Sequence, residues 1–315
     1  MRFAWVGFHG EGVPALEALL DAGANIAGVL TLRPDLAAKK SGGADYFPIC
    51  ARRGVPLHYI DNINGPEALR VLTLLRPDVV FVIGWHQIVR PDALKLAAVG
   101  MIGAHASMLP KNRGSAPVNW AIIRGERETG NSLIWLAPEV DAGDLIDQTP
   151  IPIAPTDTCA TVYQHVADTT REMLLRLLPR LLAGERPGTP QQETGEPVLH
   201  RRRPADGLVN WSGSGEQVYD FIRALTRPYP GAFSALDGHV WKIWQAALSP
   251  DTRNGHTPGQ VIGPVLSPQN DANGQLVACG SGSVVLLEVE ADDGTVLSGT
   301  ALSSQPWAGK QWAHD

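Results

Sequence analysis

The chain has 315 residues, which is too long for one small domain and suggests two or three folding units. Hydrophobic residues make up 44% of it, enough for a sizeable core, so the composition excludes bulk disorder. The formal net charge of -6 argues against a nucleic-acid-binding protein, which usually carries a basic stripe. A run of three arginines, Arg201-Arg202-Arg203, suits a solvated loop at least as well as a phosphate contact.

Cysteine usage and the N-terminal stretch bear on the compartment. Cys50, Cys159 and Cys279 are odd in number and lack CxxC spacing, which argues against a disulfide framework and against a zinc site. Residues 1–12 lack the long apolar region and the cleavage site of a signal peptide. No apolar run approaches the roughly 18 residues of a membrane span. We therefore expect a cytoplasmic protein with reduced thiols, no metal and no membrane contact.

The first 105 residues alternate β-rich apolar runs with segments of helical periodicity. Strands are predicted over residues 2–8, 25–32, 57–60, 78–83 and 99–104. Helices are predicted over residues 13–22, 66–75 and 91–98, and another short helix runs through Cys50. This alternation is typical of a doubly wound parallel α/β sheet of the Rossmann-like kind. The glycine turn after the first strand does not match GxGxxG, so a dinucleotide site is not favoured.

The same domain is predicted to continue through two more helices and two more strands. The helices are expected at residues 116–124 and 160–182, and the strands at residues 129–136 and 145–153. Pro179 should kink or break the last turn of the long helix.

A second domain of a different class is predicted after a polar, proline-containing stretch. Short strands then alternate with Asp-Gly and Asn-Gly turn signals, which is typical of a small antiparallel barrel. We predict a Rossmann-like catalytic domain over residues 1–187, a linker over 188–204 and an OB-like barrel over 205–315. The barrel offers a surface for a homodimer.

His105 is the first candidate for catalysis, because it directly follows the predicted strand 99–104. In open α/β sheets, ligands bind outside the carboxyl ends of the strands. The imidazole has an ordinary pKa of about 6.5, so it exchanges protons at neutral pH. A lone histidine is more often structural, and it is this position that favours a catalytic role.

A carboxylate in Val140-Asp141-Ala-Gly-Asp144 is the candidate partner of this histidine. Asp141 lies 36 residues later (141 − 105), also at a predicted strand end. A carboxylate beside an imidazole fixes its tautomer and makes it a better base. An aspartate that serves only turn geometry fits equally well, and spacing does not decide between Asp141 and Asp144.

Two further polar residues lie near the same predicted sheet edge. No GxSxG elbow surrounds Ser107, so it is expected to hold the loop before Leu109-Pro110 rather than to act as a nucleophile. Trp85 and His86 close the neighbouring strand and are expected to line the same crevice.

The run from His105 to Pro117, HASMLPKNRGSAP, resembles the HxSLLPxxRGxxP signature of 10-formyltetrahydrofolate-dependent formyltransferases. The likeness continues through GERETG at residues 125–130, Asp141-Ala-Gly143 and RPYPGAF at residues 227–233, a variant of that family's PWPGA turn. It spans roughly residues 1–250, and the predicted barrel fits the family's second domain. The chain most resembles the formyltransferase domain acting on UDP-4-amino-4-deoxy-L-arabinose, an amino-sugar N-formyltransferase. Methionyl-tRNA formyltransferase is a more distant relative.

The resemblance implies that a primary amine of a small molecule attacks the formyl carbon of 10-formyltetrahydrofolate. It implies that His105 assists proton transfer and that Asp141 tunes His105. The implied contacts of the pterin are Gln87, Ile88, Val89, Ala137, Pro138, Glu139, Val140 and Asp141. The implied contacts of the acceptor are Ser115, Asn119, Arg202 and Tyr229.

Two positions depart from the family pattern. The family has NxHxS, with an asparagine amide that binds the oxyanion, whereas this chain has Gly103. The loss of one oxyanion donor typically costs about 2.7–4 kcal/mol. His86 and Ser107 are the candidate replacements. Ser115 stands where the relative that acts on UDP-aminoarabinose has an arginine, which argues against that substrate in particular.

Several functions remain open at this level. The leading hypothesis is an N-formyltransferase acting on an amino-sugar nucleotide in secondary metabolism. An amino-acid-derived amine, such as N-hydroxyornithine in siderophore biosynthesis, is an alternative acceptor. A catalytically weakened homologue that only binds folate or a nucleotide is another alternative, because of Gly103. Methionyl-tRNA formylation is disfavoured, since the net charge of -6 provides no basic face for tRNA.

Overall fold

The computed structural model describes residues 1–192, 195–249, 255–267 and 272–313. Contacts divide the chain into two compact units, which we describe separately. Unit 1 comprises Met1–Pro117, Glu128–Pro152 and Val162–Arg201, and unit 2 comprises Val118–Arg127, Ile153–Thr161 and Arg202–Asp315. The linker expected over residues 188–204 stays a prediction.

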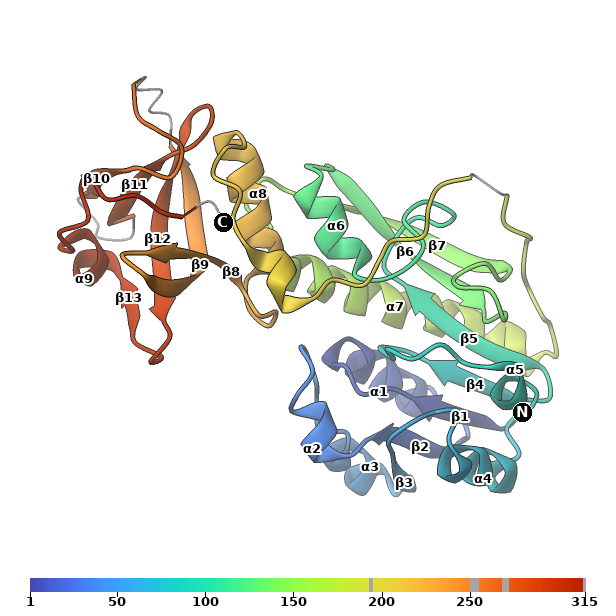
Figure 1. The fold of residues 1–315 in the computed structure, drawn as a ribbon. Helices are drawn as coiled ribbons and strands as arrows, with labels where there is room; N and C mark the ends of the chain where they lie inside the picture. The colour runs from blue at the N-terminus through green and yellow to red at the C-terminus, as the bar shows by residue number, and fades with distance from the viewer. Residues whose placement is uncertain (193–194, 250–254, 268–271, 314–315) are drawn as a thin grey trace. The chain divides into compact units, whose positions relative to one another are not determined.

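Unit 1 contains the predicted α/β sheet, which is mostly parallel but mixed, because its last two strands are antiparallel (Figure 1). Within the described residues, seven strands pair in the order β3-β2-β1-β4-β5-β6-β7. They are β1 (Phe3–Val6), β2 (Ile26–Leu32), β3 (Leu57–Ile60), β4 (Val79–Val82), β5 (Gly100–His105), β6 (Glu128–Trp135) and β7 (Leu145–Pro152). Pairing is parallel from β3 to β5, whereas β6 and β7 run antiparallel to their neighbours. β7 reverses direction because residues 136–144 form only a loop, without the crossover that a parallel return requires.

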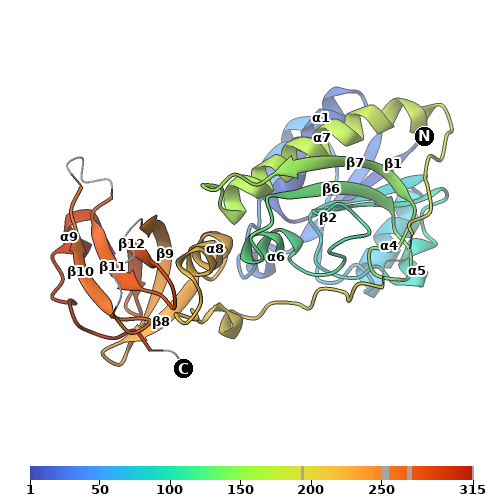
Figure 2. The ribbon, with the colours of Figure 1, turned by 90° about the horizontal axis from the view of Figure 1, so that it is seen from above.

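Helices cover both faces of this sheet (Figure 2). They are the 3-10 turn η1 (Gly10–Gly12) and the helices α1 (Val13–Asp21), α2 (Pro34–Ala37), α3 (Phe47–Arg53), α4 (Pro66–Leu75), α5 (Pro91–Leu94) and α7 (Cys159–Leu182). Alternate residues of the buried strands supply the two faces, as pleating requires. Phe3, Trp5 and Phe81 pack with α1, α3 and the C-terminal half of α7. Ala4 and Val80 pack with α4 and α5.

The expected effect of Pro179 is partly wrong, because α7 does not break there. The helix continues to Leu182, and the Pro179 carbonyl accepts a hydrogen bond from the amide of Ala183. Leu177, Leu178 and Leu181 in this last stretch are buried in the core of unit 1. Their burial offsets the one backbone hydrogen bond that a proline cannot donate.

Unit 2 contains the predicted antiparallel sheet. In the described part of the chain, its strands pair in the order β10-β11-β12-β9-β8, and β13 pairs with β12. The strands are β8 (Ala232–Leu236), β9 (His239–Ser249), β10 (Val261–Val265), β11 (Gly274–Ala278), β12 (Ser283–Ala291) and β13 (Val296–Ser298). The helices are α6 (Pro117–Ile123, whose first residue belongs to unit 1), α8 (Gly215–Leu225) and α9 (Gly299–Ser303), with the 3-10 turn η2 (Pro204–Gly207).

The C-terminal segment 309–313 bonds to both edge strands of this sheet. Gln311 forms a bridge with Gln260, next to β10, and Trp312 forms a bridge with Leu236 of β8. The amide of Ala313 also donates to the carbonyl of Ala235. The two edges are therefore joined by one short segment, which is how a small barrel removes its exposed edges.

No helix among the described residues has both the length and the apolar character needed to cross a membrane.

Candidate active site

The candidate site lies at the carboxyl edge of the sheet in unit 1. Val6 of β1 lies opposite Val82 of β4, which in turn lies opposite Gly103 of β5. The carboxyl ends of these three parallel strands therefore meet at one edge, where open α/β sheets bind ligands. His105 is the last residue of β5 and lies two residues beyond this level.

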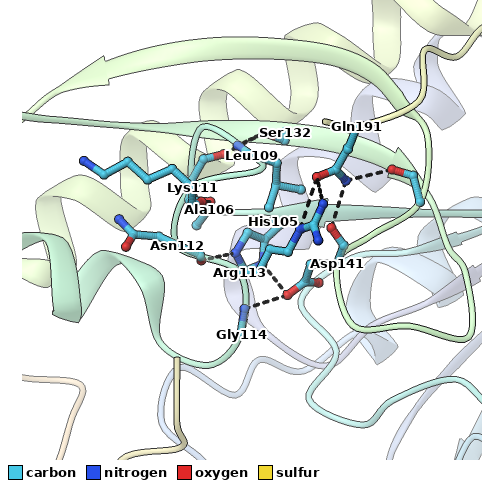
Figure 3. Close-up of polar contacts among 12 residues, drawn as sticks. His105, Ala106, Leu109, Lys111, Asn112, Arg113, Gly114, Ser132, Asp141 and Gln191 are labelled. Carbon is cyan, nitrogen blue, oxygen red and sulfur yellow. Dashed lines mark hydrogen bonds and ion pairs between the residues drawn. The ribbon is translucent and has the colours of Figure 1, made fainter. Parts of the chain in front are cut away.

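His105 is held between two oxygen atoms that come from different loops (Figure 3). Its Nε2 lies 2.8 Å from the carbonyl oxygen of Asn112, and its Nδ1 lies 3.4 Å from Oδ2 of Asp141. A carbonyl oxygen only accepts hydrogen bonds, so Nε2 carries a proton. In that tautomer Nδ1 is the ring nitrogen that carries no proton, and it lies beside the carboxylate of Asp141. The side chain is 9% exposed, which limits competition from water.

Asp141 is fixed by its own backbone geometry and by a hydrogen bond. Its φ of 52° lies in the left-handed region, which aspartate and asparagine tolerate better than most residues. Oδ2 also accepts a hydrogen bond of 2.9 Å from the amide of Gly114. Asp144 instead forms an ion pair with Arg186 at 3.8 Å. The structure thus answers the question that spacing left open, because Asp141 is the aspartate that faces His105.

The loop after His105 is anchored to the antiparallel part of the sheet. Ser132 of β6 donates a 2.6 Å hydrogen bond to the carbonyl of Ser107 and accepts one of 3.2 Å from the amide of Leu109. Gln148 of β7 donates to the carbonyl of Leu109 at 2.8 Å. The Ser107 hydroxyl donates to the carbonyl of Lys111 at 2.7 Å, and the residue is 1% exposed. This agrees with the expected loop-holding role, and as an oxyanion donor Ser107 would have to give up that bond.

The space beside Gly103 is filled by an apolar side chain. A Cβ atom added at this position would lie 2.6 Å from Cδ2 of Leu136, the residue that follows β6. Such a distance is too short for carbon atoms, so an asparagine would require Leu136 to move. The position of the family's oxyanion amide is therefore next to a methyl group.

His86 follows β4 and has an environment of a different kind. Its exposed ring meets the ring of Phe8 edge to face at 5.1 Å and lies 5.7 Å from the ring of Trp85. Partial burial, together with the charges of Lys40 and Arg201, lowers the pKa of His86 to about 4. The ring is therefore neutral at pH 7, and a neutral imidazole still has one N–H to donate.

The residues expected to contact the pterin lie on two loops: one follows β4 at this edge, and the other follows β6 and reaches His105 through Asp141. The side chain of Gln87 bonds to the loop after β3, donating to the carbonyl of Asp61 and accepting from the amide of Ile63, both at 2.9 Å. Ile88 is 61% exposed, whereas Val89 is buried in the core. The other loop is largely accessible: Pro138 and Glu139 are exposed, and Ala137, Val140 and Asp141 are half-buried.

The residues expected to contact the acceptor fall in both units. Ser115 belongs to unit 1, and its amide donates to the carbonyl of Leu199 at 3.0 Å. Asn119, Arg202 and Tyr229 belong to unit 2. Asn119 is 1% exposed and donates from Nδ2 to the carbonyl of Ala224 at 2.6 Å.

Arg202 makes aromatic contacts within unit 2. Its guanidinium lies 4.9 Å from the ring centre of Trp120 and 5.6 Å from that of Phe221. Burial lowers its pKa from the usual value. Tyr229 is half-buried, and its amide donates to the carbonyl of Thr226 at 3.1 Å.

Two residues at the site were missed by the sequence analysis. Gln191 donates to the carbonyls of Asp141 and Gly143 and accepts from the guanidinium of Arg113 (Figure 3). Gln191 lies in the polar stretch expected to be a linker, 50 residues from Asp141 and 78 from Arg113. No local pattern in the sequence marks such a long-range contact.

Structural comparison finds similar folds among proteins that bind folates. HypX from Aquifex aeolicus, in complex with tetrahydrofolic acid, matches with a TM-score of 0.67 and 19% identity over 95% of this chain and 46% of HypX. This chain thus spans about half the length of HypX. The N-formyltransferase from Helicobacter canadensis, in complex with folinic acid and dTDP-3-aminofucose, matches with a TM-score of 0.65 and 15% identity over 91% of this chain and 98% of the enzyme.

A third similar structure is WlaRD, a sugar 3N-formyltransferase in the presence of dTDP and 5-N-formyl-THF. It matches with a TM-score of 0.64 and 15% identity over 90% of this chain and 96% of WlaRD. At these identities the three structures show a shared fold. Two family descriptions match the sequence itself: formyl transferase over residues 16–178, and formyl transferase C-terminal domain over residues 202–305. The chain belongs to the formyl transferase family of enzymes.

Proposed function

We propose that this protein transfers the formyl group of 10-formyltetrahydrofolate to a primary amine of a small molecule. The observation that carries the proposal is the pairing of the buried His105 with the half-buried Asp141 at the carboxyl edge of the sheet, within a formyl transferase domain. Three similar structures, crystallised with folates, support the choice of formyl donor.

The chemistry requires one base and one acid. The amine nitrogen attacks the formyl carbon, the bond from that carbon to N10 breaks, and the amine loses a proton while N10 gains one. Nδ1 of His105 takes the proton from the amine and returns it to N10, so one side chain performs both transfers. The carboxylate of Asp141, 3.4 Å away, stabilises the ring while it is charged.

The proposed contacts with the pterin are residues 87–89 and 137–141. They are supported by the place of their loops, which lie at the same edge as His105 or reach it through Asp141, and by the exposure of Ile88, Pro138 and Glu139. An exposed apolar side chain and accessible backbone beside a catalytic pair suit a flat, polar ring system. The side chain of Gln87 is already bonded within the protein, so its contribution would come from its backbone.

The acceptor we propose is an amino-sugar nucleotide. It is supported by two similar structures, one with dTDP-3-aminofucose and one with dTDP. Ser115, Asn119, Arg202 and Tyr229 remain the proposed acceptor contacts. UDP-4-amino-4-deoxy-L-arabinose is the less favoured nucleotide, since Ser115 lacks the charge of an arginine. An amino-acid-derived amine such as N-hydroxyornithine is the alternative within the same chemistry.

The experiment is a formyl-transfer assay with the purified protein. It combines 10-formyltetrahydrofolate with a panel of dTDP- and UDP-linked amino sugars and with N-hydroxyornithine, and it detects both the formamide and tetrahydrofolate. We expect turnover with one class of amine, and a rate with that amine that is lower by about 10²–10⁴ in His105→Asn. Transfer by His105→Asn at the wild-type rate would contradict the proposal.

A second candidate function is favoured by the packing around Gly103. Leu136 lies next to the position of the family's oxyanion amide. This packing favours a protein that binds folate or a nucleotide but transfers formyl groups poorly. Gly103→Asn combined with Leu136→Ala gives an amide donor the room it needs. An increase in kcat of about tenfold or more would favour the weakened homologue, because one such donor is worth at least that much. A decrease would show that the site works through another donor, for which His86 is the better placed candidate.

A further inference from the structure

The segment that follows α7 bonds to both loops of the catalytic pair. The carbonyl of Pro187 accepts a 2.6 Å hydrogen bond from Nε1 of Trp135, and Thr189 exchanges two backbone hydrogen bonds of 2.8 Å with Leu145. Farther along, the amide of Leu199 donates to the carbonyl of Arg113 at 2.7 Å. Residues 187–189 therefore bond to the strand ends that flank the loop 136–144, and Leu199 bonds to the loop 106–116; these two loops carry the two partners of His105.

Gln191 is the residue of this stretch whose side chain reaches Asp141 and Arg113, and all of its polar atoms are used (Figure 3). Nε2 donates to the carbonyls of Asp141 at 2.8 Å and Gly143 at 2.7 Å. Oε1 accepts from Arg113, at 2.8 Å from Nη2 and 3.3 Å from Nε. An amide has two donor hydrogens and one acceptor oxygen, so these contacts match its capacity.

The position of these bonds matters because His105 depends on two separate loops. One loop supplies the carbonyl of Asn112, which directly precedes Arg113, and the other supplies the carboxylate of Asp141. Gln191 connects Arg113 to the backbone of Asp141 itself. The bond from the amide of Gly114 to Asp141 is a second direct link between the loops.

The backbone at Asp141 has an unfavourable conformation, which contacts with neighbouring groups must stabilise. A φ of 52° lies in the left-handed region, which is sterically unfavourable for a residue that has a Cβ atom. Two residues later the chain passes so close to Trp135 that a Cβ at Gly143 would overlap the Trp135 carbonyl oxygen. The two bonds from Nε2 of Gln191 hold the carbonyls on either side of this turn, and so fix where the carboxylate points.

We propose that Gln191 is a positioning residue that aligns the Asp141 carboxylate with His105, and that Arg113 orients the Gln191 amide for this task. The inference rests on the proposed function, because it assigns a role in the same proton transfer. Gln191 touches no reacting atom. It acts through the turn that carries Asp141.

The decisive variant is Gln191→Glu. A glutamate keeps the size of the side chain and its bonds to Arg113, but it presents an oxygen to the carbonyls of Asp141 and Gly143. The two hydrogen bonds to these carbonyls are replaced by repulsion between oxygen atoms. We expect kcat to fall about tenfold to a hundredfold while KM for the amine changes little, because the loss is in alignment rather than binding.

A matched control lies at the next position. Gln192 is the same residue type and is exposed, so Gln192→Glu introduces the same charge without touching the turn. We expect Gln192→Glu to behave like the wild type. Gln191→Ala serves as the second variant, with thermal melting as the check that each protein folds.

A second measurement does not depend on activity. In protein labelled with ¹⁵N-histidine, the ring nitrogens of His105 are assigned by comparison with His105→Asn. Gln191→Glu and Gln191→Ala should shift these resonances and leave those of His86 in place. If the wild type shows no formyl transfer, the proposed function fails but this measurement still tests the role of Gln191. Unmoved His105 resonances in both folded variants, or wild-type kcat, would overturn the inference.

Discussion

Two neighbouring strand ends each present a histidine, and their environments differ. His105, at the end of β5, is buried between two oxygen acceptors. His86, after β4, is exposed and has no hydrogen-bond partner among the described residues. The groups around it are the rings of Phe8 and Trp85 and the charges of Lys40 and Arg201.

The difference shows that neighbours, rather than residue type or strand position, decide what a histidine can do. His105 has an oxygen acceptor beside each of its ring nitrogens. Nearby cations and partial burial oppose the protonation of His86, so His86 remains neutral at pH 7. We therefore propose His105 for proton transfer, and His86 only for the role of a neutral hydrogen-bond donor.

Among the variants that distinguish the two histidines, His105→Asn is expected to have the largest effect. Asparagine keeps a polar side chain near the Asn112 carbonyl but cannot carry a proton between the amine and N10. We expect kcat/KM for formyl transfer to fall by about 10²–10⁴. In His86→Asn, kcat/KM should fall by less than about tenfold, because asparagine still offers a neutral N–H donor. Equal losses in the two variants, measured by initial rates, would remove the distinction.

The second-largest effect concerns the Asp141 carboxylate, which lies beside His105 and has no counterpart beside His86. Asp141→Asn retains an oxygen for the Gly114 amide and tolerates the φ of 52°, so it removes the charge and little else. We expect kcat to fall roughly a hundredfold with an unchanged melting temperature. Asp144→Asn is the matched control, because that aspartate pairs with Arg186 instead. A wild-type kcat in Asp141→Asn would show that the pair does not act as a unit.

Much of the secondary structure around the sheet edge that carries the two histidines could be predicted from the sequence. The strand Leu57–Ile60 and the helix Pro66–Leu75 have the bounds that the sequence predicts, because prolines mark their starts. β5 ends at His105, one residue later than predicted, since a strand buried on both faces is a continuous apolar run that ends near the first polar residue.

The contacts that distinguish the two histidines could not be predicted in the same way. Leu136 fills the space beside Gly103 from a strand end 33 positions away (136 − 103), and Gln191 supports Asp141 from 50 positions away. The antiparallel direction of β6 likewise depends on tertiary pairing. Periodicity describes one element at a time, so side-chain contacts between distant elements leave no trace in it.

A smaller effect is expected at Ser107, which lies in the loop that follows His105. Its hydroxyl donates to the Lys111 carbonyl at 2.7 Å and is buried. Ser107→Ala should lower the free energy of unfolding by about 1 kcal/mol, the usual worth of one such bond. If Ser107 only holds the loop, kcat changes by less than about threefold. A hundredfold loss in kcat would instead identify it as the donor that replaces the missing asparagine.

The smallest effect is on the pH dependence of stability, and it tests the protonation of His86 directly. The pKa of His86 is lowered from 6.5 to about 4, so between these values the unfolded chain binds a proton that the folded chain does not. Stability should therefore fall as the pH drops from 6.5 towards 4, and His86→Gln should remove part of that fall. The side chain is exposed, so solvent screening reduces the expected difference to about 1 kcal/mol.

Urea unfolding at pH 7 and pH 4.5 measures this difference between the wild type and His86→Gln. At pH 7 the two proteins should be nearly equal, because His86 is neutral in both the folded and the unfolded state. At pH 4.5 the variant should be the more stable one. Lys40→Gln provides a separate check, since removing a nearby cation should raise the pKa of His86 and shrink the same pH-dependent loss. An identical loss in all three proteins would mean that charges beside His86 do not set its protonation, and the contrast with His105 would then rest on hydrogen bonding alone.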